Sequence, residues 1–379
     1  MGANSVLGTR ICLARTVGRV RGEGLGNEIF PWAKAYLASR ELGFGMLPPA
    51  WGLNRRRYWE EFGTSRLDWC GHLALRAALP TQTVTDEMVR STGESDYGAA
   101  IRVLDGEYGW SRRRALVLVH RNMTGGLVSI ARSRNFLRNT LLGRLPDIGL
   151  DDCEPGADRI HVAVHVRLGD FCATGPTGPG PGDTNERLPA EWYRSVLGAL
   201  RERLGPALHI EIMSDDPGLV ARMLPEWRES IAPPRSTLGD LSVLAAADLL
   251  VCSISTFSML AAFLSDAPYI WYRPHLAETD GFLSILGSRP DGRAATVAAN
   301  AVREQRGAAG MPARGVPLGV GEGVPNWLAD HLAAKVALRR RSADLIHFGV
   351  LPAGAPAGRP DPVTPGPRLR DPHEVAQVP

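Results

Sequence analysis

The sequence lacks any long uninterrupted run of apolar residues. A membrane-spanning helix needs about 18 such residues in succession, and no stretch of the 379-residue chain reaches that length. The apolar segment 6–20 is interrupted by Arg10, Arg15 and Arg19, which is not the pattern of a secretory signal peptide. We therefore expect a cytoplasmic protein without a transmembrane segment, which leaves peripheral contact with a membrane open.

Paired cysteines and clustered histidines are missing as well. The five cysteines are an odd number, and no two of them form a Cys-x-x-Cys pair. This excludes a disulfide framework and a structural zinc site of the usual spacing. Cys12 and Cys252 lie within apolar runs and are expected in the core. A reducing compartment fits this usage.

The chain also has little net charge. Its formal charge is only +3, which does not favour nucleic acid as a partner. Three runs of arginine, at 55–57, 112–114 and 339–341, could form local anion sites. The better interpretation of each run is a solvated basic face.

What is present suits a two-domain α/β protein. The length allows two separate cores, and the apolar share of 44% is ordinary for a soluble protein. An acidic, turn-rich segment at 147–158 is the candidate linker. We expect an N-terminal Rossmann-like domain over 1–150 and a C-terminal one over 155–285. Beyond them we expect an extension over 286–351, whose helix at about 326–341 packs back, and a disordered Pro- and Gly-rich tail over 352–379.

Strands and helices are predicted to alternate along both halves. A β-prone segment at 10–20 leads through a glycine-rich turn into a helix that stops near Gly43, and residues 115–120 form a short buried strand. The second half has strands predicted at 160–166, 208–213, 249–252 and 269–272, with helical segments between them. This alternation indicates parallel βαβ units. Residues 50–115 show no clear pattern.

Polar side chains follow three of these strands. His161, His165 and Arg167 share one face of the first, because side chains alternate along a strand. An arginine at the carboxyl end suits a diphosphate, since its planar fork donates two hydrogen bonds. The alternative is that Arg167 pairs with Asp170 and ties down the loop.

The next two strand ends add complementary groups. Asp215 and Asp216 could accept hydrogen bonds from a ribose or a guanine edge, although Asp before Pro is also an ordinary helix start. The turn at 253–258 is rich in hydroxyls and opens a helix, whose free N–H groups form a phosphate site. An arginine fork, a carboxylate pair and a helix N-terminus together indicate a nucleoside diphosphate.

Four segments carry a family resemblance. HVRLGD at 165–170, MSDDP at 213–217 and DLLVCSISTFS at 248–258 resemble, in this order, the motifs of the α1,2/α1,6-fucosyltransferase superfamily. GLGNEIF at 24–30 is similar to the glycine-rich opening of the α1,2 branch. The resemblance implies two Rossmann-like domains facing a cleft (the GT-B arrangement), inverting transfer of fucose from GDP-fucose to a hydroxyl, and neither metal nor cofactor.

The resemblance also implies roles for individual residues. Arg167 would contact the β-phosphate, and His165 the guanosine part. The remaining donor-binding candidates are Asp215 or Asp216 for the guanine edge, Ser255, Thr256 and Ser258 for the diphosphate, and Asn27 for the sugar.

A general base and the acceptor stay open at this point. Four carboxylates, Asp170, Asp183, Glu186 and Glu28, are candidates for the base, and the loop 173–186 could fold over the acceptor as a lid. The acceptor is a glycan, a glycoconjugate or a small molecule, and region 50–115 is expected to help select it. Two alternatives are a transferase for another nucleotide sugar and an inactive nucleotide- or glycan-binding relative. A Rossmann dehydrogenase is disfavoured, because the turn GEGLGN lacks the third glycine of the dinucleotide motif.

Overall fold

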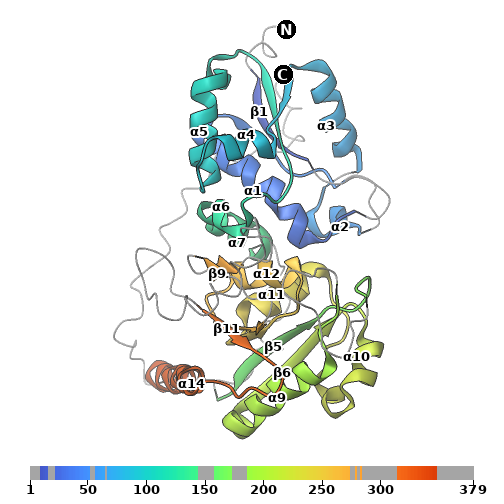
Figure 1. Ribbon diagram of the computed structural model, residues 1–379, viewed down its shortest axis with the longest axis vertical. Coiled ribbons are helices and arrows are strands. Elements are labelled where there is room, and N and C mark those ends of the chain that lie inside the picture. Colours follow the sequence, from blue (N-terminus) through green and yellow to red (C-terminus); the bar gives the residue numbers. More distant parts are fainter. Residues whose placement is uncertain are drawn as a thin grey trace, which may run out of the picture.

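The chain folds into two α/β domains stacked one on the other (Figure 1). The computed structural model describes residues 9–15, 22–51, 56–64, 66–143, 158–172, 186–273, 278–279, 282–283 and 314–347. Within this part, each domain is built on its own parallel sheet, so the predicted α/β class with two Rossmann-like domains facing a cleft is confirmed. No helix among these residues is both long and apolar enough to cross a membrane.

The N-terminal domain has a four-stranded sheet in the order β2-β1-β4-β3, with every pair parallel. The first strand ends at Ala14, earlier than predicted. The segment that showed no pattern supplies four helices and β3. The elements are β1 (Arg10–Ala14), α1 (Leu25–Leu42), β2 (Gly45–Leu47), α2 (Tyr58–Phe62), α3 (Arg66–Ala78), β3 (Thr81–Thr83), α4 (Asp86–Ser91), α5 (Tyr97–Tyr108), β4 (Leu116–His120), α6 (Gly126–Ser129) and α7 (Arg134–Leu142).

The C-terminal domain has a five-stranded parallel sheet in the order β11-β8-β7-β5-β6. All seven residues of β5 are buried, as expected for a strand covered on both faces. Its β11 lies beyond residue 285, where the sequence placed the end of the domain. The elements are β5 (Ile160–Val166), α9 (Ala190–Leu204), β6 (Leu208–Ser214), α10 (Pro217–Met223), α11 (Thr237–Ala246), β7 (Leu249–Val251), α12 (Thr256–Leu264), β8 (Tyr269–Tyr272), β9 (Glu278–Thr279), β10 (Phe282–Leu283), β11 (Gly315–Leu318) and α14 (Asn326–His347).

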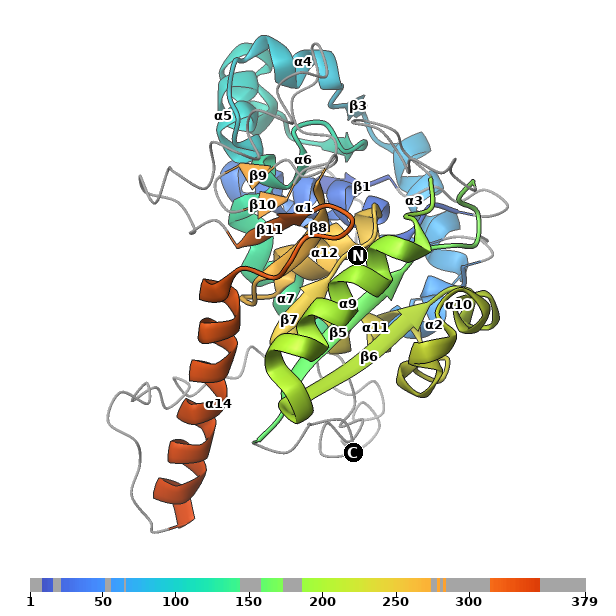
Figure 2. The same ribbon diagram turned by 60° about the horizontal axis from the view of Figure 1, so that its bottom comes forward.

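Helices cover both faces of this sheet. Figure 2 shows α9 in front of the sheet and α11 and α12 behind it. The long helix α14 is tied to the start of β7, because Lys335 contacts the Asp248 carboxylate at 3.1 Å and Arg339 pairs with the same group. Arg339 thus has an internal partner, contrary to the interpretation of its run as a solvated face.

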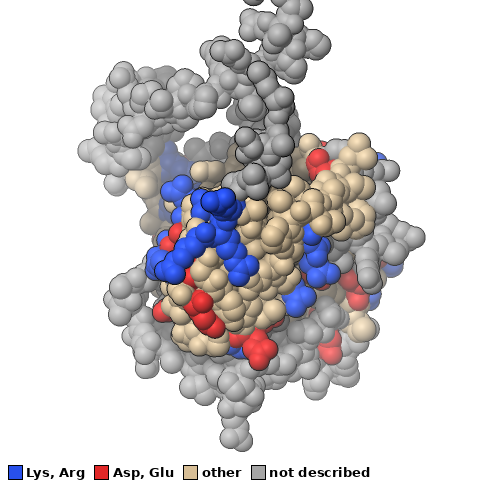
Figure 3. Space-filling model, turned by 90° about the horizontal axis from the view of Figure 1, so that it is seen from above, with Lys and Arg blue, Asp and Glu red and all other residues tan. Residues whose placement is uncertain are grey.

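The other arginine runs differ from each other. Arg112, Arg113 and Arg114 are exposed and precede the amino end of β4. Figure 3 shows the molecule from above, where Lys and Arg side chains gather in groups. Arg57 is exposed and pairs with Glu60, whereas Arg56 lines a cavity described below.

Helix α1 brings the two domains together. It starts after Gly24 and ends at Gly43, whose φ of 66° is the left-handed conformation of a helix stop, as predicted. Near its start, Gly26 packs against the first turn of α12. A Cβ at Gly26 would lie 2.3 Å from the Thr256 carbonyl carbon, so only glycine permits this approach.

Two side chains of the N-terminal domain bind the ends of helices in the other domain. Arg134 on α7 donates to the carbonyl oxygens of Phe263, Leu264 and Ser265 at 2.5, 3.1 and 2.9 Å, at the end of α12. Glu61 on α2 accepts hydrogen bonds from the first N–H groups of α11, at 2.7 and 3.2 Å. Each charge complements the helix end that it meets.

Candidate functional site

A cleft of about 480 Å³ separates the domains at the carboxyl ends of β5, β6 and β7. This is the edge where open parallel sheets bind ligands. The three strand ends singled out from the sequence all contribute to it, together with the start of α1. Its lining includes Gly24, Leu25, Gly26, Asn27, Arg56, Tyr58, His165, Arg167, Asp170, Phe171, Ser214, Asp215, Arg235, Thr237, Asp240, Ile254, Ser255, Thr256 and Phe257.

Arg167 follows β5 and lies on the wall of this cleft. Its Nη2 donates to Asp170 Oδ1 at 2.6 Å, and its Nη1 lies 3.0 Å from Asp215 Oδ2. The guanidinium also lies over the ring of Phe171, 5.5 Å from its centroid. Arg167 therefore ties down the loop after β5, and the same guanidinium borders an open cleft.

The two neighbouring aspartates have separate roles. Asp215 accepts hydrogen bonds from the backbone N–H groups of Leu168 and Gly169 at 2.9 and 3.0 Å, which shapes the turn beneath Arg167. Asp216 is absent from the cleft lining and caps α10, where its Oδ1 accepts from the Leu219 N–H at 2.9 Å. Of this pair, only Asp215 borders the cleft.

His165 is buried beneath the cleft as a neutral imidazole. Its Nδ1 lies 2.8 Å from Ser258 Oγ and 3.0 Å from Ser253 Oγ. Burial, followed by the charge of Arg167, lowers the pKa of His165 to about 4. Ser258 was predicted to contact the diphosphate, but the structure contradicts this. Its side chain is completely buried and bonds to His165 and to the turn at Ser253.

The start of α12 faces the cleft. Ser255 is the N-cap, and its Oγ accepts from the Phe257 N–H at 3.2 Å. Ser255 and Thr256 both line the cavity. The first N–H groups of a helix bind anions through hydrogen bonds and the helix dipole, so this wall suits a phosphate.

Asn27 lies opposite, on the first turn of α1. Its side-chain oxygen is buried and has no hydrogen-bond partner within the described part of the chain. A buried polar atom usually has a partner. A hydroxyl group of a bound sugar could supply one.

The predicted general bases lie in different places. Asp170 lines the cleft and pairs with Arg167. Glu186 forms an isolated bridge with Cys172 and is not part of the lining. Glu28 is buried on α1 and borders a second cavity, and Asp183 lies outside the described residues.

The cleft lining also includes Arg56, Tyr58, Arg235, Thr237 and Asp240, none of which was among the predicted site residues, although the run 55–57 was noted as a possible anion site. Asp240 has the strongest chemical signature, because burial raises the pKa of its carboxyl group to about 6. Arg235 opposes this rise and Glu211 and Glu61 add to it. A single charge within the apolar helix TLGDLSVLAA was the signal that could have identified it.

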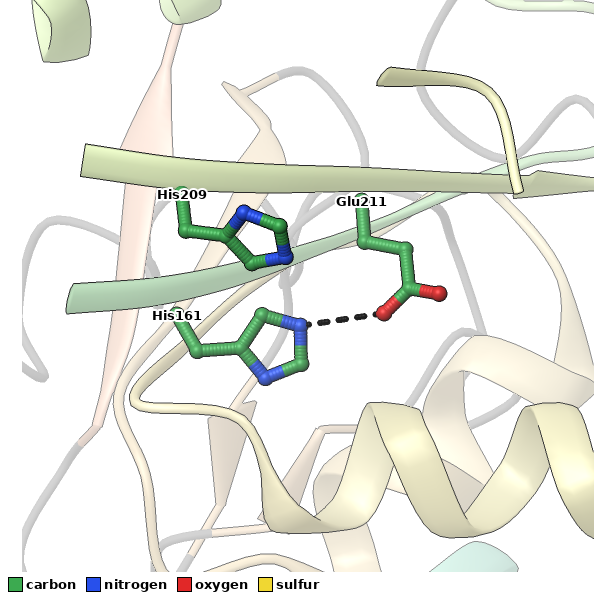
Figure 4. A group of neighbouring side chains, drawn as sticks. All are labelled: His161, His209 and Glu211. Carbon is green, nitrogen blue, oxygen red and sulfur yellow. Dashed lines mark hydrogen bonds and ion pairs between the residues drawn. The ribbon is translucent and has the colours of Figure 1, made fainter. Parts of the chain in front are cut away.

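A group of three side chains in the described part could hold a metal ion (Figure 4). His161, His209 and Glu211 project from β5 and β6, where His161 and His209 are register partners, and their ligand atoms lie within 4.8 Å of one another. Glu211 accepts from His161 at 3.2 Å and also pairs with Arg235. The hydrogen bond from His161 and the pairing with Arg235 lower the pKa of Glu211 to about 2, so this carboxylate is already engaged by protein groups.

Comparison with known proteins adds little. No protein-family model matches the sequence, and no curated protein matches it. Among solved structures, the E. coli ADP-heptose LPS heptosyltransferase II is 13% identical with a TM-score of 0.37, over 88% of this chain and 100% of that one. The E. coli heptosyltransferase WaaC with ADP is 17% identical with a TM-score of 0.36, over 78% and 98%. At these values the two matches support no inference about this chain.

Proposed function

We propose that this chain is a metal-independent, inverting glycosyltransferase that moves fucose from GDP-fucose to a hydroxyl group of a glycan or glycoconjugate. The observation that carries the proposal is the meeting of Arg167, Asp215 and the start of α12 at one interdomain cleft, with Asn27 opposite them. A cation, a carboxylate and a helix N-terminus are the partners that a nucleoside diphosphate requires. The choice of fucose rests on the resemblance of the same segments to fucosyltransferase motifs.

The reaction would be a direct displacement. The acceptor oxygen forms a bond to the anomeric carbon while the bond from that carbon to the β-phosphate oxygen breaks, and the bonding electrons leave with GDP. Arg167 and the first N–H groups of α12 stabilise the charge that develops on the diphosphate. The proton of the acceptor hydroxyl passes to a carboxylate, for which Asp240 is our first candidate, because a pKa of about 6 suits a general base near neutral pH.

The test of this assignment is Arg167→Ala. Removing the guanidinium should weaken GDP binding and lower the release of GDP from GDP-fucose by roughly 10²- to 10³-fold, the usual effect of losing one donor to a developing anion. Arg194→Ala is the matched control, because Arg194 is an exposed arginine on α9 that pairs with Glu191 and Glu226. If Arg167→Ala leaves both GDP affinity and turnover unchanged, the diphosphate assignment is wrong.

A donor panel separates the alternatives. A bound donor stabilises the fold by mass action, by about 2.7 kcal/mol at 100 times its dissociation constant. GDP-fucose should therefore raise the melting temperature more than UDP- or dTDP-sugars do. A larger shift with another donor identifies a different sugar, and GDP binding without release of GDP from GDP-fucose identifies an inactive relative.

A further inference from the structure

A second cavity of about 650 Å³ lies in the N-terminal domain beside the cleft. It opens at the carboxyl ends of β1 and β4 and is closed on the other side by α3. The two cavities share Asn27 and Met123. Its lining residues are Leu13, Ala14, Arg15, Glu23, Asn27, Glu28, Pro31, Ala50, Trp69, His72, Leu73, Arg76, Arg121, Asn122 and Met123.

Three arginines converge on this cavity from different elements. Ala14 and His120 are register partners at the ends of β1 and β4, so Arg15 and Arg121, the next residues, leave the sheet side by side. Arg76 comes from α3 on the opposite wall. The two carboxylates of the lining, Glu23 and Glu28, leave a surplus of positive charge.

Two of these arginines have donors without acceptors. The Nε atoms of Arg76 and Arg121 are buried, and neither has a hydrogen-bond partner among the residues that the structure describes. A buried charged donor is costly unless it is paired. Two such donors on facing walls of one cavity indicate that an anion completes the site.

The loop that carries Arg121 is held in place by a lysine of helix α1. Lys34, buried on α1, donates to the carbonyl oxygens of Asn122 and Arg121 at 3.0 and 3.5 Å. Asn122 has a left-handed φ of 62°, and its side chain donates to Asp86 at 2.8 Å. The backbone that carries Arg121 is therefore fixed by these contacts.

Helix α3 adds an aromatic and apolar surface. Trp69, His72, Leu73 and Arg76 follow the spacing i, i+3, i+4, i+7, so they form one face of the helix, and that face lines the cavity. Leu73 is 41% exposed. An aromatic ring beside arginines suits a sugar that carries a charged group.

We propose that this second cavity binds the acceptor, and that the acceptor is an anionic saccharide bearing a phosphate or a carboxylate group. Arg15, Arg76 and Arg121 hold the anion, Trp69 contacts the sugar, and the reacting hydroxyl passes Asn27 into the cleft. The inference rests on the proposed function for its reaction, and on the cavity alone for its ligand class.

Isothermal titration without donor tests the ligand class. The probes are N-acetylglucosamine 1-phosphate and galactose 6-phosphate, glucuronic acid, and the neutral sugars galactose and N-acetylglucosamine. The wild-type protein should bind an anionic probe at least tenfold more tightly than its neutral counterpart, with an advantage that shrinks as salt is added. A stronger preference for the phosphates or for the uronic acid identifies the anion. Equal binding of charged and neutral probes overturns the proposal.

Variants locate the site. Arg76→Gln and Arg121→Gln should each weaken anion binding at least tenfold, and Arg121→Lys should restore part of it. If Arg76→Gln or Arg121→Gln fails to fold, because these side chains are half-buried, Arg15→Gln still tests the site, since Arg15 is exposed. Arg113→Gln, in the exposed run before β4, is the control and should bind as the wild type does. Unchanged anion binding in Arg15→Gln, Arg76→Gln and Arg121→Gln overturns the proposal.

The two proposals can fail separately. In one outcome, the wild-type protein neither binds nor cleaves GDP-fucose, yet it binds anions through these arginines. This result contradicts the proposed function and supports the anion site. In the other outcome, the protein cleaves GDP-fucose but shows no preference for anionic probes. This result contradicts the anion site and supports the proposed function.

Discussion

At the scale of single residues, hydrogen-bond partners and burial decide which polar groups are available at the cleft. Asp215 and Asp216 are neighbours in the sequence, yet one contacts the turn under Arg167 and the other caps a helix. Ser258 is likewise taken up by His165. Asp240, by contrast, lines the cleft with a carboxyl group whose pKa is raised to about 6 by burial.

Asp240→Asn tests this carboxyl group. Because its pKa is higher in the folded protein than the usual 3.8, the group favours folding at low pH, and that contribution is lost as the pH rises through about 6. The variant should therefore melt at a higher temperature than the wild type at pH 8 and at a similar temperature at pH 4, while its turnover with donor and acceptor falls. Melting curves and GDP release measure the two effects.

Asp330→Asn, at an exposed position on α14, is the control for that comparison and should change neither property. Wild-type turnover in Asp240→Asn would rule out the base assignment. A stability gain equal at pH 4 and pH 8 would contradict the raised pKa.

At the scale of elements, helix ends join the domains. The last carbonyl groups of a helix lack partners within the helix, and Arg134 supplies them for α12 from the other domain. Glu61 acts similarly on the first N–H groups of α11. The relative position of the domains, and hence the cleft, depends on these contacts.

Arg134→Ala should lower the free energy of unfolding by about 1.5–3 kcal/mol, because it removes charged hydrogen bonds at a side chain that is only 14% exposed. Arg138→Ala is matched to it, on the same helix and with the same partner Asp266, but 42% exposed. That variant should cost less than about 1 kcal/mol. Urea unfolding of both variants measures the loss of unfolding free energy in each. Equal losses would show that the hydrogen bonds of Arg134 to the end of α12 add no stability beyond the pairing with Asp266.

At the scale of the whole molecule, one close approach of backbone to backbone joins the two domains beside the cleft. The start of α1 meets the start of α12 at Gly26, where a Cβ would lie 2.3 to 2.7 Å from three backbone atoms. Backbone cannot move aside as a side chain can, so the two domains would have to separate.

Gly26→Ala should therefore destabilise the protein by about 1–3 kcal/mol, the usual cost of overpacking, and weaken GDP binding through the altered cleft. Gly24→Ala is the control two residues earlier, because a Cβ there meets nothing within 4 Å. Thermal unfolding compares the two variants, and GDP titration compares Gly26→Ala with the wild type, because Gly24 itself lines the cleft. A Gly26→Ala protein that behaves as Gly24→Ala does would show that the domains tolerate separation.

The sequence by itself determined the local elements of the C-terminal domain. The strands Ile160–Val166 and Tyr269–Tyr272 have the predicted bounds, since continuous apolar runs bounded by polar turns favour buried parallel strands. The meeting of the three strand ends also followed, because parallel strands end at the same edge. The short elements of 50–115 carry too little periodicity to be recognised, and β11 joins the sheet across a long sequence separation.

Only the tertiary structure decided which polar side chains reach the cleft. Asp240 lies on α11, and Arg56 precedes α2. Both border the cleft because elements distant in the sequence pack around them. The arginines of the second cavity likewise come from three places: directly after β1, directly after β4, and from α3. The periodicity of the local sequence specifies whether a segment forms a strand or a helix and which side chains share a face. The partners of a side chain depend on which elements fold against it.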